Sequence, residues 1–103
     1  MFVRISHGRF NPASESDVQR IVEGQVIPVI QGLPGFQRYY GGVNRGAGTL
    51  VAVTVWDTEE HASFSRENLA GVMPALQAIG VTLEPPQIFE VTVEAKAALA
   101  AAG

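Results

Sequence analysis

Two histidines are the side chains of this sequence whose ordinary pKa lies nearest neutrality, and they are its natural candidates for proton transfer. His7 falls in a strand-like run at Phe2–Phe10, where it could orient or deprotonate a phenol. A partly exposed histidine with a structural role is the alternative at such a strand end. His61 follows a polar helix start, and we expect it to be solvated. His7 is therefore the candidate catalytic group.

Trp56 ends a second strand-like run, Thr49–Trp56, and is the largest side chain that could line a ligand site. Ala52 and Thr54 share one face of this run with Trp56, because side chains alternate across a strand. Both are small, so helices packed on this face would leave room for a flat ligand. The alternative is that Trp56 is a core residue whose indole N–H finds a partner within the protein.

The elements that must position these residues follow from the spacing of apolar side chains. It predicts strands at Phe2–Phe10, Phe36–Val43, Thr49–Trp56 and Gln87–Glu94, and helical segments at Glu15–Gln31, Glu59–Arg66 and Leu69–Ile79. This β-α-β-β-α-β order indicates an α+β, ferredoxin-like fold with a four-stranded antiparallel sheet and helices on one face. In the later helical segments, Phe64, Leu69 and Met73 either complete the core or roof a cleft.

The ends and interior of the helices carry further local signals. Ser14 is expected to cap the first helix, and Asp57 or Thr58 the second. Pro28 lies inside the first helix and cannot donate a hydrogen bond to the carbonyl of Gly24, so we expect a kink or a tightened last turn there.

The second arm of the hairpin is apolar on both faces. Val51, Val53 and Val55 occupy the face opposite Trp56. A strand of this kind is covered on both sides, and a chain of 103 residues has helices for only one of them. The sheet of a second copy would supply the other cover, so a homodimer is expected.

Composition excludes several classes of function. The net charge is −3 and no run of Lys or Arg occurs, which argues against nucleic acid or an anionic membrane as a partner. The two histidines and scattered carboxylates show no metal-ligand spacing, and no glycine-rich phosphate loop is present. No cofactor and no metal are therefore expected. No apolar run reaches the length of a membrane span, and a cytoplasmic protein is the expectation.

One longer pattern is more specific. It begins at Leu33-Pro-Gly-Phe, continues through a glycine-rich bend, and closes on a β-branched strand ending in Trp56-Asp-Thr-Glu-Glu. This pattern resembles the antibiotic biosynthesis monooxygenase-like family of dimeric α/β-barrel proteins. The resemblance covers about residues 2–93, within an expected domain at 1–94; the Ala-rich tail at 95–103 lies outside it.

The resemblance implies a cofactor-independent monooxygenase acting on a small aromatic or quinone-like compound, with Trp56 lining the substrate cleft. Ala52 stands where the oxygenases of the family carry an Asn, and the residue trio of the haem-degrading members is not reproduced. A non-catalytic ligand-binding or structural dimer is therefore the alternative. The expected site comprises two catalytic residues, Trp56 and His7, and the substrate-binding residues Ser6, Ala52, Thr54, Phe64 and Met73.

Overall fold

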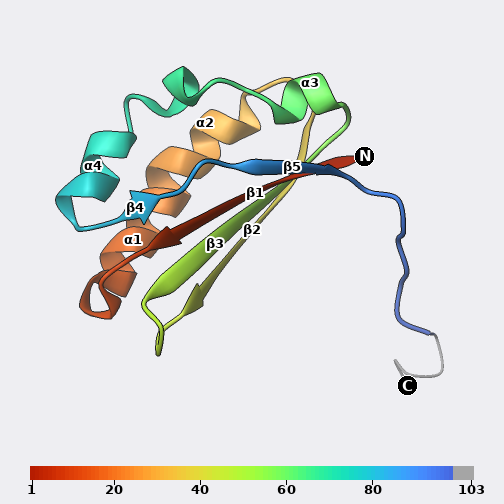
Figure 1. Ribbon diagram of the computed structural model, residues 1–103. Helices are drawn as coiled ribbons and strands as arrows, with labels where there is room; N and C mark the ends of the chain where they lie inside the picture. The colour runs from red at the N-terminus through yellow and green to blue at the C-terminus, as the bar shows by residue number, and fades with distance from the viewer. Residues whose placement is uncertain (99–103) are drawn as a thin grey trace.

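The computed structural model describes residues 1–98 as one antiparallel sheet with helices on a single face (Figure 1). Its five strands are β1 (Phe2–Arg9), β2 (Phe36–Asn44), β3 (Thr49–Trp56), β4 (Thr82–Leu83) and β5 (Gln87–Glu90). β2 and β3 form the hairpin, β1 pairs with β3, and both β4 and β5 pair with the other edge of β1. This arrangement confirms the predicted α+β, ferredoxin-like fold.

The helical segments are η1 (Pro12–Ser14), α1 (Glu15–Ile21), η2 (Val22–Val26), α2 (Ile27–Gln31), α3 (Glu59–Ala62), η3 (Arg66–Leu69) and α4 (Met73–Ala78). η1 and η3 are 3-10 turns, whereas η2 is a π turn. α1, η2 and α2 follow one another without a break and fill the predicted helix at Glu15–Gln31. The later helical region contains three short segments where the sequence predicted two. No helix in residues 1–98 is long and apolar enough to cross a membrane.

Near Pro28, where a kink or a tightened last turn was expected, the helix contains a π turn, which is wider than an α-helical turn and not tighter. Val18, Val22, Val26 and Ile30 recur at a spacing of four residues. In a regular α-helix, four residues turn through about 400°, so this stripe would drift by about 40° at each step. A wider turn has more residues per revolution and offsets that drift. The turn ends at Val26, two residues before Pro28, whose missing N–H already breaks the α-helical bonding pattern.

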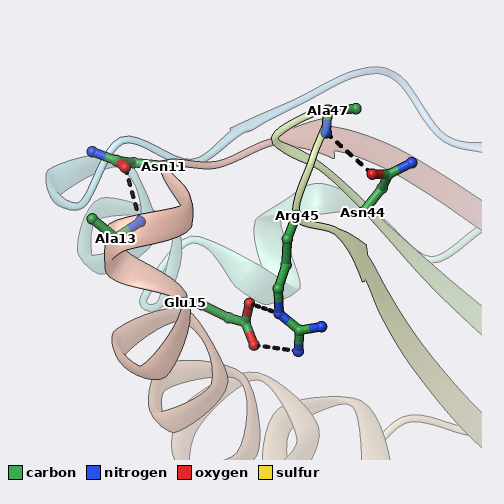
Figure 2. A network of polar contacts seen from close by, with 6 residues as sticks. All are labelled: Asn11, Ala13, Glu15, Asn44, Arg45 and Ala47. Atoms are coloured by element: carbon green, nitrogen blue, oxygen red, sulfur yellow. Dashed lines mark hydrogen bonds and ion pairs between the residues drawn. The ribbon is translucent and has the colours of Figure 1, made fainter.

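Side-chain caps confirm one predicted helix start and correct the other. Thr58 Oγ1 accepts a hydrogen bond from the backbone N–H of His61 at 3.1 Å, as expected for a cap of α3. Ser14 makes no capping bond. Asn11 takes this role one turn earlier, since its Oδ1 accepts from the N–H of Ala13 at 3.0 Å (Figure 2). The 3-10 turn η1 therefore precedes the helix proper.

An ion pair ties the tip of the β2–β3 hairpin to the start of α1 (Figure 2). Arg45 Nε and Nη2 donate to the two carboxylate oxygens of Glu15 at 2.5 and 2.8 Å, and this bond holds the pKa of Glu15 below its usual value. Asn44 Oδ1 accepts from the N–H of Ala47 within the tip, and Gly48 turns the chain with φ of 66°. The hairpin is thereby fixed against the helix layer.

The last strand is shorter than predicted and is preceded by one that the sequence did not indicate. β5 ends at Glu90, not Glu94, and β4 pairs with the end of β1. Between them the N–H of Glu84 donates to the carbonyl of His7 at 2.8 Å, while Pro85 and Pro86 cannot donate at all. One strand is thus divided in two. Residues 95–98 form no regular structure, and the remainder of the Ala-rich tail lies outside the described residues.

Candidate ligand-binding site

A cavity of about 100 Å³ lies between the sheet and the helices. Its floor contains Arg4 and Ser6 of β1 and Ala52 and Thr54 of β3. The strand register pairs Ser6 with Ala52 and Arg4 with Thr54, so all four side chains point to the helix layer. The small Ser6–Ala52 pair leaves the free space, because neither side chain reaches the helices opposite.

Apolar side chains from two helical regions form the walls of this cavity above the sheet. One wall is the stripe along α1, η2 and α2, namely Val18, Val22, Val26 and Ile30. The other wall comes from the segment after α3, and its members are Phe64, Leu69, Val72, Met73 and Leu76. The π turn contributes directly, since it keeps the stripe aligned above the floor. The site is therefore an apolar pocket with a few polar groups on one side, the usual form of a small-molecule site.

The five residues predicted to bind substrate all line this one cavity. They are Ser6, Ala52, Thr54, Phe64 and Met73. Strand alternation puts the first three on one side of the sheet, the side that the helices cover, while Met73 begins α4 and Phe64 lies in the loop between α3 and η3. Their convergence is observed, whereas contact with a ligand stays a prediction.

Trp56 does not line the cavity, which corrects its expected placement. Its side chain is fully buried, at 0% exposure, and its Nε1 donates to Thr54 Oγ1 at 2.8 Å. Its ring packs against those of Phe36 and Phe64, with centroids 5.5 and 5.2 Å apart. Trp56 is therefore a core residue that supports Thr54 and Phe64 from behind. Its catalytic role stays a prediction that this geometry does not support.

His7 and His61 also lie away from the cavity. His7 is exposed on the open face of β1, where the register pairs it with Val51. Strand alternation separates it from Ser6, so its expected place in the cleft is corrected. His61 is half-buried near the end of β3, and its Nδ1 lies 2.6 Å from Asp57 Oδ1. This bond holds the pKa of Asp57 below its usual value. Proton transfer by His7 in the cavity has no support from these positions.

Arg4 is the residue of the site that the sequence reasoning missed. It is only 7% exposed, and its Nη1 donates to the carbonyls of Ala62 and Phe64 at 3.0 and 2.9 Å. Its guanidinium carbon lies 3.8 Å from the centroid of the Phe64 ring. Burial lowers the pKa of Arg4, and the charge of Arg66 lowers it further. A cation on the helix-facing side of a central strand was the signal available in the sequence.

Tyr39 joins the cavity to a larger groove of about 400 Å³ between β2 and the first helix. Its half-buried side chain lines both spaces, and burial raises the pKa of its hydroxyl. Gly41 on the same face has no side chain, and a Cβ there would press on the Tyr39 ring. A ligand larger than the cavity could therefore extend past Tyr39 into the groove.

Comparison with known proteins gives the fold a name. No family model matches the sequence, and no curated protein matches it. Solved structures do, and several are monooxygenases. The cofactor-independent oxygenase SnoaB from Streptomyces nogalater is 24% identical with a TM-score of 0.60, covering 90% of this chain and 94% of its own. The monooxygenase of the gene ActVA-Orf6 from Streptomyces coelicolor, crystallised with nanaomycin D, is 20% identical with a TM-score of 0.65, covering 94% and 90%.

A third similar structure is a candidate antibiotic biosynthesis monooxygenase from Deinococcus radiodurans. It is 15% identical with a TM-score of 0.68, and the likeness covers 95% of this chain and 99% of that one. At these identities the likeness concerns the backbone arrangement. The protein therefore has the fold of the antibiotic biosynthesis monooxygenases, as the sequence pattern had indicated.

Proposed function

We propose that the protein binds a small aromatic or quinone-like compound in the cavity above Ser6 and Ala52 and acts on it as a cofactor-independent monooxygenase. The observation that carries this proposal is the cavity itself, where all five predicted substrate-binding residues converge. The fold supports it, because similar structures include a cofactor-independent oxygenase and a monooxygenase crystallised with nanaomycin D. We infer the substrate class and the reaction from the shape and the apolar lining of the cavity.

In such a reaction the substrate is the electron donor. A ring methylene activated by neighbouring carbonyl and aromatic groups reacts with dioxygen, so that CH2 and O2 yield C=O and H2O. Two C–H bonds break, one oxygen atom enters the product, and the other leaves as water with both hydrogens. The carbon loses the four electrons that dioxygen gains. The protein has to hold the substrate in a dry pocket and accept one proton. Among the described lining residues, Glu84 is the carboxylate that could accept it.

A non-catalytic ligand-binding protein is the second candidate, and one observation favours it. Neither histidine lines the cavity, and the indole N–H of Trp56 is already bound to Thr54. A pocket with no histidine base, and with Glu84 as its candidate proton acceptor, binds a ligand more readily than it transforms one. Saturable binding of an aromatic compound without oxygen consumption would select this alternative.

Anthrone is a direct test substrate, because oxidation of its methylene gives anthraquinone. The expected result is oxygen uptake, followed with an electrode, matched by the rise of anthraquinone absorbance. Ala52→Leu should abolish both signals, since its added carbons fill a cavity of about 100 Å³. Ala78→Leu is the matched control, because Ala78 is exposed on α4 and the same substitution there leaves the cavity unchanged. Full activity in the folded Ala52→Leu variant would overturn the proposed site.

We also propose that two copies associate through the open face of the sheet. Val51 and Val53 are half-buried there, with no helix above them, and Tyr40 and Phe89 add exposed aromatic area at 55% and 50%. The register places Tyr40 opposite Val53, so these side chains form one apolar surface. A second copy presents the same surface and suits an isologous dimer. The dimeric α/β barrel implied by the sequence resemblance is the arrangement we expect.

A further inference from the structure

We propose that Arg4 binds an anionic oxygen of the ligand, so that the cavity selects aromatic oxyanions, phenolates or carboxylates, over neutral aromatic compounds. The inference rests on the proposed function for the idea that this cavity binds an aromatic compound. Beyond that function, the ligand has to carry a negative charge, and Arg4 is the side chain that recognises it. Neither the fold nor the apolar lining of the cavity implies that requirement.

The first support is the missing counter-ion of Arg4. Its side chain is more than nine-tenths buried, yet the ion pairs found within residues 1–98 all involve other residues. Glu84 also lines the cavity but makes no ion pair with Arg4. A second cation, Arg66, lines the same space and adds to the positive charge. Buried charges are usually paired, so an uncompensated guanidinium facing a cavity favours an anion there.

The second support is the way the guanidinium is held. Nη1 donates to the carbonyls of Ala62 and Phe64, and the Phe64 ring fixes the plane from one side. Nε and Nη2 donate to no group in residues 1–98, and no side-chain nitrogen there is both fully buried and without a partner. These two donors therefore keep some accessible area, and Arg4 is one of the residues that line the cavity. A pair of fixed N–H donors is the arrangement that binds an oxyanion with two hydrogen bonds.

The third support is the neighbourhood of Arg4. The hydroxyl of Ser6 lies on the same face of β1 and makes no hydrogen bond within the described residues, so it could donate to the same anion. The free volume of about 100 Å³ is of the order needed for one benzene-sized ring. The structure thus points to a single aromatic ring in the cavity, its anionic oxygen toward Arg4, with any larger part of the ligand in the groove beyond Tyr39.

4-Nitrophenol is a suitable probe, because it ionises near neutral pH and its anion absorbs visible light. When bound, it should ionise at lower pH than in free solution, since Arg4 stabilises the anion. The phenolate should bind about tenfold tighter than neutral 4-nitroanisole, the effect of one or two charge-assisted hydrogen bonds. Benzoate should displace the phenolate, and benzamide should not. A pKa of the bound probe equal to or above that of the free probe, measured in the wild-type protein, would overturn the proposal, and so would competition by benzamide as strong as that by benzoate.

Arg4→Met keeps an unbranched apolar stem over Phe64 and removes the charge. It should abolish the ionisation shift and leave 4-nitroanisole binding unchanged, whereas Arg4→Lys should retain part of the shift. The wild-type titration needs no variant, so it stays decisive if Arg4→Met fails to fold. A lowered pKa of the bound probe without anthrone oxidation would support the anion site and contradict the monooxygenase. Anthrone oxidation without a change in the pKa of the probe would support the monooxygenase and contradict the anion site.

Discussion

The two faces of the central strands β1 and β3 differ in both chemistry and cover. The helix-covered face buries polar side chains, among them Arg4 at 7% and Thr54 at 5% exposure. The open face presents Val51 and Val53, half-buried, with no helix above them. An ordinary core would have the reverse distribution, with polar groups outside.

The difference indicates two kinds of partner. Polar groups that are buried beside a cavity need directional partners, and most of those on the covered face already have them: Trp56 donates to Thr54, whose hydroxyl lies 3.4 Å from the Arg4 carbonyl. The unused donors of Arg4 and the hydroxyl of Ser6 are exceptions. The open face needs only a matching apolar surface, because burial of apolar area is not directional. A small ligand suits the first face and a second copy the second.

The largest effect is expected from a charged residue on the open face of the sheet. Val53→Glu places a carboxylate in the centre of the proposed dimer surface, and burying it there without a partner costs several kcal/mol. Light scattering should then report a monomer for the variant and a dimer for the unmodified protein. Gln77→Glu, on the exposed surface of α4, is the control and should leave the mass unchanged. A dimer that survives Val53→Glu would place the interface elsewhere.

The covered face can be tested next at Trp56. Trp56→Phe should lower the free energy of unfolding by about 1–3 kcal/mol, because ring volume is lost and Thr54 loses its donor. Binding of 4-nitrophenol to the folded variant should be unaffected, since Trp56 does not line the cavity. Urea unfolding and absorbance titration measure the two quantities separately.

Thr54→Val isolates the hydrogen bond in that prediction. It keeps the shape of the side chain and removes the acceptor of the indole N–H. The double variant with Trp56→Phe should be less destabilised than the sum of the two single changes, because the bond can be lost only once. Additive losses would contradict a hydrogen bond between the two side chains. Weaker probe binding in Trp56→Phe would indicate that Trp56 contacts the ligand.

The smallest expected effect lies outside both faces, at the Asp57–His61 pair. The hydrogen bond from His61 lowers the pKa of Asp57 below the 3.8 of an unperturbed carboxyl. The pair therefore contributes stability above that pH, and the contribution is lost as pH falls through the folded-state value. Asp57→Asn should flatten the acid limb of stability measured by urea unfolding. In a His61→Asn background the same change should have less effect; an equal effect would show that another partner sets this pKa.

Much of the fold, and part of the arrangement of side chains in the candidate site, could be predicted from local sequence patterns. Alternation along Thr49–Trp56 placed Ala52 and Thr54 on one side of the strand and the valines on the other, because a strand has a period of two regardless of its surroundings. The same rule puts His7 and Ser6 on opposite faces of β1, so the sequence alone already argued against a place for His7 beside Ser6 in the cleft. Helical spacing likewise indicated the inward-facing positions of the later helices, Met73 among them, whereas Phe64 lies in the loop between α3 and η3.

The remaining features depend on contacts between residues distant in the chain. Arg4 acquires its role from carbonyls about sixty positions away, at Ala62 and Phe64. Trp56 stops being a ligand candidate because Phe36 and Phe64 enclose it. Periodicity states which face a side chain takes, since it follows from backbone geometry. It does not state what meets that face, because the distances between elements, and hence cavities and hydrogen bonds, are set only when the helices pack on the sheet.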